Sequence, residues 1–146
     1  DLGRHSEEVF GTSRFLVIYF VSNFFGFVAS LFWSPHAISI GAAAAVCGLI
    51  GAMIAHGYRT GSSHRSFYMR WAVIIILIGL MPGFRIDNAA HLGGMATGFV
   101  IAYFAGVPRY NNPGEFIWKI SAATILLDVM YYFYQVYESM PAASLV

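Results

Sequence analysis

The chain has 146 residues, of which 58% are hydrophobic and 10% are charged, and its formal net charge is +1. A soluble domain carries roughly 25% charged residues, so this composition excludes an ordinary soluble domain and indicates a membrane protein. The sequence contains no dense run of cations, which argues against a nucleic-acid partner. The partner that the composition predicts is the lipid bilayer.

Five apolar segments approach the length of roughly 20 residues that a helix needs to cross a bilayer. A polar stretch, 1–14, precedes the first of them, and we expect it to be a solvent-exposed connector on the cytoplasmic side. The sequence therefore predicts an all-α polytopic membrane protein with five transmembrane spans. The predicted spans are 15–33, 39–56, 67–84, 89–107 and 116–137.

The distribution of cations predicts the orientation of the chain. If consecutive spans alternate in direction, residues 1–14, 57–70 and 108–119 lie on one side and hold seven of the eight cations, while Arg85 lies on the other. Because cations accumulate on the cytoplasmic side, we expect the chain to start in the cytoplasm and end outside. The seven cations are Arg4, Arg14, Arg59, Arg65, Arg70, Arg109 and Lys119.

The second and fourth predicted spans are unusually rich in small residues. Small side chains allow helix backbones in a membrane to approach closely, and such residues recur on one face of each of these spans. We therefore expect the two spans to pack on each other. The residues that carry this pattern most clearly are Gly48 in the second span and Gly94 and Gly98 in the fourth.

The fourth span also carries His91. An ionisable side chain within a membrane is costly and indicates a functional site. The second and fourth spans run in the same direction, and position 43 and His91 both lie roughly 3–5 Å inside the start of their helices at 1.5 Å of rise per residue. The sequence therefore predicts that these two positions meet near the outer surface, within reach of water.

A serine at position 43 would complete a catalytic pair, because a serine hydroxyl becomes a nucleophile when an imidazole takes its proton. The backbone N–H groups of Gly41, Ala42 and Ala43, at the start of the helix, would then stabilise the oxyanion, and Gly41 would allow the substrate backbone to approach. Position 43 is alanine, however, and a methyl group cannot attack a carbonyl.

Two sequence motifs carry a resemblance to a known family. Residues 41–49 (GAAAAVCGL) resemble the Gly-x-Ser-x motif of the rhomboid intramembrane serine proteases, with Ala43 at the serine. Residues 89–94 (AAHLGG), followed by Gly98, resemble the histidine helix of that family, and residues 2–15 resemble the connector after its second helix. The resemblance covers residues 2–106.

The resemblance implies a rhomboid-like helix bundle in which the five spans are helices three to seven of the six-plus-one class. Residues 15–107 would form the four-span core, and 108–146 a connector and an additional C-terminal helix. It implies a Ser/His endopeptidase that cleaves single-span membrane proteins near the outer surface. We expect the chain to reside in a membrane of the bacterial inner (plasma) membrane type, and we expect neither a metal nor another cofactor.

The sequence departs from the family pattern at two places. The nucleophile is replaced by Ala43, and the family's first two helices, which contribute to the oxyanion hole, are expected to come from elsewhere in the same protein or from a companion fragment. Two interpretations follow. The chain is a protease inactivated at Ala43, or it is a natural pseudoprotease that binds or escorts membrane clients. A channel around His91 and Asp128 is disfavoured, because the spans lack polar faces.

Overall fold

The computed structural model describes residues 1–33, 41–81, 86–109 and 112–139. The described residues form five helices and no strand, in agreement with the predicted all-α class. Arg85 and parts of the predicted second and third spans, 39–40 and 82–84, lie outside the described residues. The helices are α1 (Leu2–Trp33), α2 (Ala43–Thr60), α3 (His64–Gly79), α4 (Asn88–Ala105) and α5 (Glu115–Ser139).

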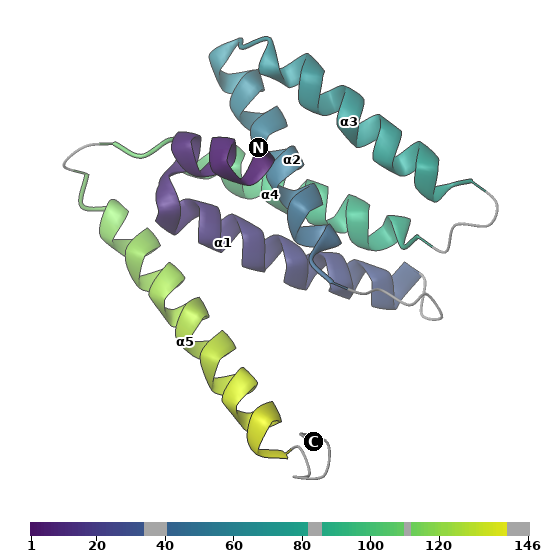
Figure 1. The fold of residues 1–146 in the computed structure, drawn as a ribbon. Helices are drawn as coiled ribbons and strands as arrows, with labels where there is room; N and C mark the ends of the chain where they lie inside the picture. The colour runs from purple at the N-terminus through teal and green to yellow at the C-terminus, as the bar shows by residue number, and fades with distance from the viewer. Residues whose placement is uncertain (34–40, 82–85, 110–111, 140–146) are drawn as a thin grey trace.

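The stretch 1–14, which we expected to be a polar connector, is helical from Leu2 onward. Apolar residues at helical spacing explain the difference: Phe10 is buried in the core, and Leu2 and Val9 pack against it. The helix changes direction at Gly11, whose φ of 72° and ψ of 156° are not helical. The first segment of α1 therefore packs against the bundle at an angle to the apolar segment that follows it (Figure 1).

Two of the helices, α1 and α5, are long and apolar enough to cross a membrane by length and composition. The other three are shorter, with 18 residues in α2, 16 in α3 and 18 in α4. The presence of spanning helices agrees with the predicted membrane class. That the chain crosses the membrane five times stays a prediction.

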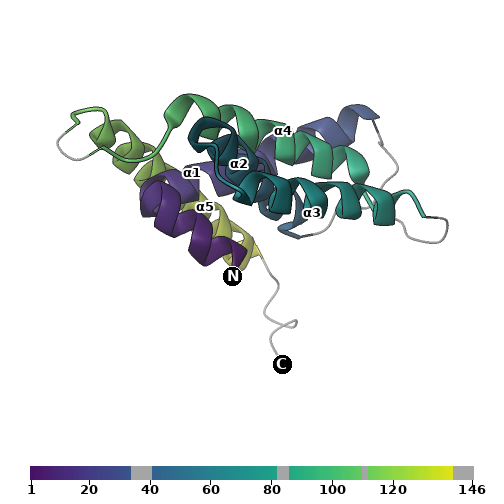
Figure 2. The same ribbon diagram turned by 90° about the horizontal axis from the view of Figure 1, so that it is seen from above.

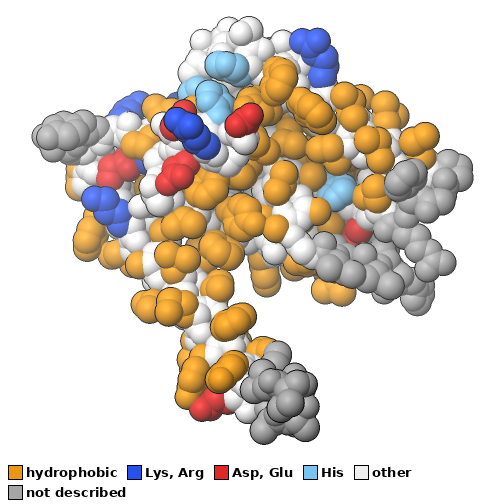
Figure 3. Space-filling model, viewed as in Figure 1, with side chains coloured by type: hydrophobic (Ala, Val, Ile, Leu, Met, Phe, Trp, Pro, Cys, Tyr) orange, Lys and Arg blue, Asp and Glu red, His pale blue; other side chains and the backbone are white. Residues whose placement is uncertain are grey.

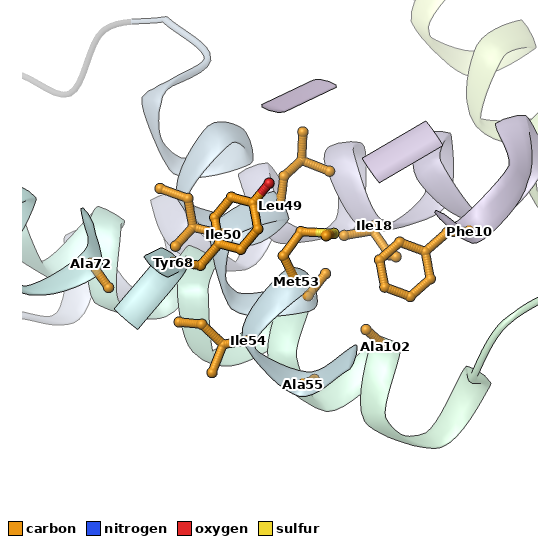
Figure 4. Close-up of a cluster of buried hydrophobic side chains, with 11 residues drawn as sticks. Phe10, Ile18, Leu49, Ile50, Met53, Ile54, Ala55, Tyr68, Ala72 and Ala102 are labelled. Atoms are coloured by element: carbon orange, nitrogen blue, oxygen red, sulfur yellow. The ribbon is translucent and has the colours of Figure 1, made fainter. Parts of the chain in front are cut away.

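Helices α1, α2 and α4 pack against one another and form the centre of the molecule, with α3 against α2 and α5 against α1 (Figures 1 and 2). Most of α2 is buried, which makes it the central helix. The apolar core between these helices includes Phe10 and Ile18 of α1, Met53 of α2 and Ala102 of α4 (Figure 4). Outside this core, large apolar side chains cover much of the surface, as lipid contact requires (Figure 3).

The contact between α2 and α4 is made by backbone atoms. A Cβ atom added to Gly94 would collide with the backbone oxygen of Ala44, and one added to Gly98 would collide with that of Gly48. The contacting residues advance together along both helices, so α2 and α4 run parallel and in a fixed register. Glycine is required at these positions because any side chain would separate the two backbones.

This close contact leads to a test of stability. We expect Gly98→Ala to lower the free energy of unfolding by about 1–3 kcal/mol, because the added methyl group overpacks the α2–α4 contact. Gly3→Ala is the matched control, since Gly3 is also helical and has no neighbouring atom within 4 Å of an added Cβ. We expect the control to be neutral or stabilising by up to about 1 kcal/mol. The free energies of unfolding of both variants are measured by reversible unfolding in detergent micelles, monitored by circular dichroism. Equal free energies of unfolding for Gly98→Ala and Gly3→Ala would contradict the close contact between α2 and α4.

Candidate active site

The start of α2 presents exposed backbone at the end of the bundle. Gly41 is exposed with a φ of 85°, a conformation that glycine adopts readily, and Ala42 is the residue before the helix. Ala42 caps the helix without a side-chain hydrogen bond, and the first helical bond runs from the Val46 N–H to the Ala42 carbonyl at 3.0 Å. The amides that precede Val46 are therefore free of helical acceptors, as at every helix N-terminus.

The start of α4 is fixed by Asp87. Its Oδ1 accepts a hydrogen bond of 3.0 Å from the Ala90 N–H, and its Oδ2 accepts one from the Ser30 hydroxyl of α1. Asp87 is 7% exposed, so the carboxylate ties α4 to α1 within the protein. Asp87 is not among the site residues predicted from the sequence, although an aspartate directly before a predicted helix is a recognised capping signal.

The starts of α2 and α4 meet at Gly26 of α1. A Cβ atom added to Gly26 would lie 2.6 Å from the Cβ of Ala44 and 2.7 Å from the backbone oxygen of Ala90. Ala44 and Ala90 are the chain neighbours of Ala43 and His91. Ala43 and His91, which the sequence predicts to meet, are therefore each next in the chain to a residue at this junction of α1, α2 and α4.

Ala43 and His91 differ in environment within this junction. Ala43, the first residue of α2, is exposed, and His91, in the first turn of α4, is half-buried. The Nδ1 atom of His91 is buried and makes no hydrogen bond to the residues that the structure describes. Cys47, one turn after Ala43, is 2% exposed, so its thiol cannot serve as a substitute nucleophile at the surface.

The remaining candidate residues divide into two groups. Gly48, Gly94 and Gly98 are buried in the contact between α2 and α4, where they hold the two helices together. Asp128 lies on α5 and lines an apolar groove with residues of α1, such as Phe20 and Phe24. His91 does not line that groove, so within the described chain the groove does not join these two ionisable side chains.

Comparison with known proteins identifies the family to which the chain belongs. The family model described as "Rhomboid domain" matches residues 2–108. The chain therefore belongs to the rhomboid family, whose members are membrane proteins. No solved structure matches the chain.

Two relatives match most of this chain at more than 30% identity. The chain is 33% identical over 134 residues to the rhomboid protease GluP of Bacillus subtilis, a match that covers 87% of this chain and 25% of GluP. It is 34% identical over 126 residues to RHOMBOID-like protein 6, mitochondrial, of Arabidopsis thaliana, covering 78% of this chain and 40% of the relative.

A third relative is named as inactive. Inactive rhomboid protein 1 of Papio anubis is 28% identical over 151 residues, covering 91% of this chain and 17% of the relative. The chain thus spans 17–40% of the length of these three relatives. Membership of the family is therefore compatible with a protease and with an inactive protein.

The capping role of Asp87 can be tested directly. We expect Asp87→Ala to lower the free energy of unfolding by about 0.5–2 kcal/mol, because the Ala90 N–H loses its acceptor. Asp87→Asn keeps an oxygen acceptor in the same place and should lose less stability. Unfolding in detergent micelles compares the two variants. An equal loss in both would show that the hydrogen bond to Ala90 does not stabilise the helix.

Proposed function

We propose that this chain has the catalytic framework of an intramembrane serine endopeptidase whose nucleophile position, Ala43, lacks the reactive hydroxyl. With a serine at that position it would cleave single-span membrane proteins near the outer membrane surface, and in the present form it is inactive. The observation that carries the proposal is the junction at Gly26, where the chain neighbours of Ala43 and His91 lie against the same residue. The register of α2 and α4 supports it, because both candidate positions lie in the first turn of parallel helices in backbone contact.

A serine at position 43 would react in two steps. Its oxygen would add to the substrate carbonyl while its proton passes to His91, and collapse of the tetrahedral intermediate would break the C–N bond as His91 protonates the leaving amine. Water would then hydrolyse the acyl ester, with His91 again taking and returning the proton. These roles require no metal or other cofactor.

The backbone around position 43 suits the negative charge that develops on the carbonyl oxygen. Amides at the start of α2 have no helical acceptor, and the N-terminal end of the helix dipole favours an anion. Gly41, Ala42 and Ala43 are exposed there, so a substrate strand can reach their backbone. We assign oxyanion stabilisation and substrate approach to this segment.

The proposed orientation places this end of the bundle at the outer surface. The cation distribution supports five spans with the chain start in the cytoplasm, in a membrane of the bacterial inner type. A single-span substrate would enter from the lipid and unwind near its outer end, because helical backbone does not present its carbonyls to a nucleophile.

A non-catalytic protein that binds or escorts membrane clients is the alternative, and Ala43 itself favours it. The relative named inactive rhomboid protein 1 shows that the family contains members described as inactive. The codon for position 43 in the natural gene separates the two interpretations. A serine codon supports an inactivated protease, and an alanine codon supports a pseudoprotease.

The central experiment introduces Ala43→Ser into the complete gene product. We expect the variant, reconstituted in proteoliposomes, to cleave a single-span substrate near its outer end and to react with a fluorophosphonate probe. Adding His91→Ala should lower the cleavage rate by about 10²–10⁴-fold, the usual contribution of a general base. Gel electrophoresis of the substrate measures cleavage, and fluorophosphonate labelling of the protein measures the reactivity of the serine.

Ala42→Ser is the matched control. It adds the same hydroxyl at the N-cap, one residue before the helix begins, and residue 42 is also exposed. We expect no cleavage and no labelling of this variant. Labelling of neither serine variant, in protein whose helical content is unchanged, would overturn the catalytic proposal while leaving the client-binding alternative open.

A further inference from the structure

A cavity lies at the opposite end of the bundle from Ala43 and His91. It has a volume of about 400 Å³ and is lined by residues beside the Gly11 bend of α1, by the C-terminal ends of α2 and α4, and by the residues that follow α4, up to Arg109, together with Asn112. Three arginines line it, namely Arg14, Arg59 and Arg109. The proposed protease chemistry uses none of them.

Two glycines shape the walls of this cavity. Gly11 bends α1 and leaves room for Pro108, whose Cγ lies 3.3 Å from where a Cβ would be. Gly106 leaves room for the Arg59 guanidinium, whose Nη1 lies 3.0 Å from the corresponding position. Arginines from three separate segments thus line one cavity.

The cations at the cavity exceed the anions. Arg14 is 4% exposed and forms a two-pronged ion pair with Glu115, at 2.5 and 2.7 Å. In the described ranges the other ion pair joins Arg4 and Glu8, so Arg59 and Arg109 have no carboxylate partner there. Among the described residues, three arginines therefore line the cavity and one of them, Arg14, is paired with a carboxylate.

Hydrogen-bond donors also remain available. The Nε of Arg14 is buried and has no partner among the described residues. Arg59 uses Nη1 for the Tyr103 carbonyl, at 2.6 Å, which leaves its other N–H groups to be satisfied. Arg109 contributes its backbone N–H to Glu115 at 3.0 Å, so its charged side chain is not engaged by that bond.

A purely structural role for these arginines accounts for part of the arrangement. Arg14 and Glu115 hold the start of α5 to α1, and Arg59 neutralises a carbonyl at the C-terminal end of α4, where the helix dipole is negative. That role requires neither Arg109 nor the volume of the cavity. It also leaves a surplus of two positive charges.

We propose that this cavity binds a phosphate group, carried by an anionic lipid headgroup or by a free phosphate ion. Arginine is suited to this ligand because its planar fork matches phosphate oxygens and forms short, charge-assisted hydrogen bonds. The cation distribution predicts that this end of the bundle faces the cytoplasm, where the leaflet carries anionic lipids and basic pockets between helices bind their headgroups. The proposal does not rest on the proposed protease, because the two sites use different residues at opposite ends of α2 and α4.

The test measures binding to the full chain in detergent by native mass spectrometry. Short-chain phosphatidylglycerol is titrated into the protein, with phosphatidylcholine as the zwitterionic comparison and inorganic phosphate as competitor. We expect saturable binding of phosphatidylglycerol, and the variant Arg59→Gln/Arg109→Gln should bind it at least about tenfold more weakly, because two charge-assisted contacts are lost. The matched control, Arg4→Gln/Arg70→Gln, removes the same charge from exposed positions outside the cavity and should bind within about twofold of the parent chain.

The outcomes distinguish a lipid headgroup site, a free phosphate site and the absence of a phosphate site. Displacement of phosphatidylglycerol by millimolar inorganic phosphate would identify a free phosphate site, and resistance to it would identify a lipid site. Equal weakening in both double variants, or equal binding of the two lipids, would overturn the proposal. If the double variant unfolds at a lower temperature, Arg109→Gln alone replaces it, since no hydrogen bond or ion pair joins the Arg109 side chain to α4 among the described residues. Unchanged binding by that folded variant would also overturn the proposal.

Discussion

The backbone contact between α2 and α4 is the constraint on which the rest of the structure depends. Gly94 and Gly98 leave no room between the helices, and so they fix spacing, direction and register together. Because the helices are parallel, their N-terminal ends share one end of the bundle and their C-terminal ends share the other. Both candidate sites are consequences of that alignment, one at each end of the same pair of helices.

The two ends differ in electrostatics because aligned helix dipoles add. At the N-terminal end, free amides and the positive end of each dipole favour an anionic intermediate, and Asp87 caps one helix there. At the C-terminal end the dipoles are negative, and Arg59 bonds a terminal carbonyl of α4. The surplus of guanidinium groups at that end more than offsets the helix carbonyls, which explains how an anion site can exist beside two helix C-termini.

Sequence patterns predicted the features that depend on local composition. The apolar segments gave five helices, and the small residues around Gly48 and Gly94 indicated the helices that touch. The prediction of a connector over 1–14 was wrong, because apolar side chains such as Phe10 pack this mostly polar segment against the core as a helix. The pair Arg14–Glu115 joins residues 101 positions apart, and no local pattern indicates such a contact.

The proposed chemistry depends on one side chain, that of residue 43, which the described helix contacts do not use. Ala43 is exposed, so its side chain supports no packing, whereas the neighbouring Ala44 is buried against Gly26 and Gly94. Exchange of serine and alanine at position 43 therefore leaves the helix contacts intact and alters only the available hydroxyl. On the proposed function, the framework would lose cleavage and keep the surface that meets the substrate, which is compatible with a family whose relatives include one named as a protease and one named as inactive.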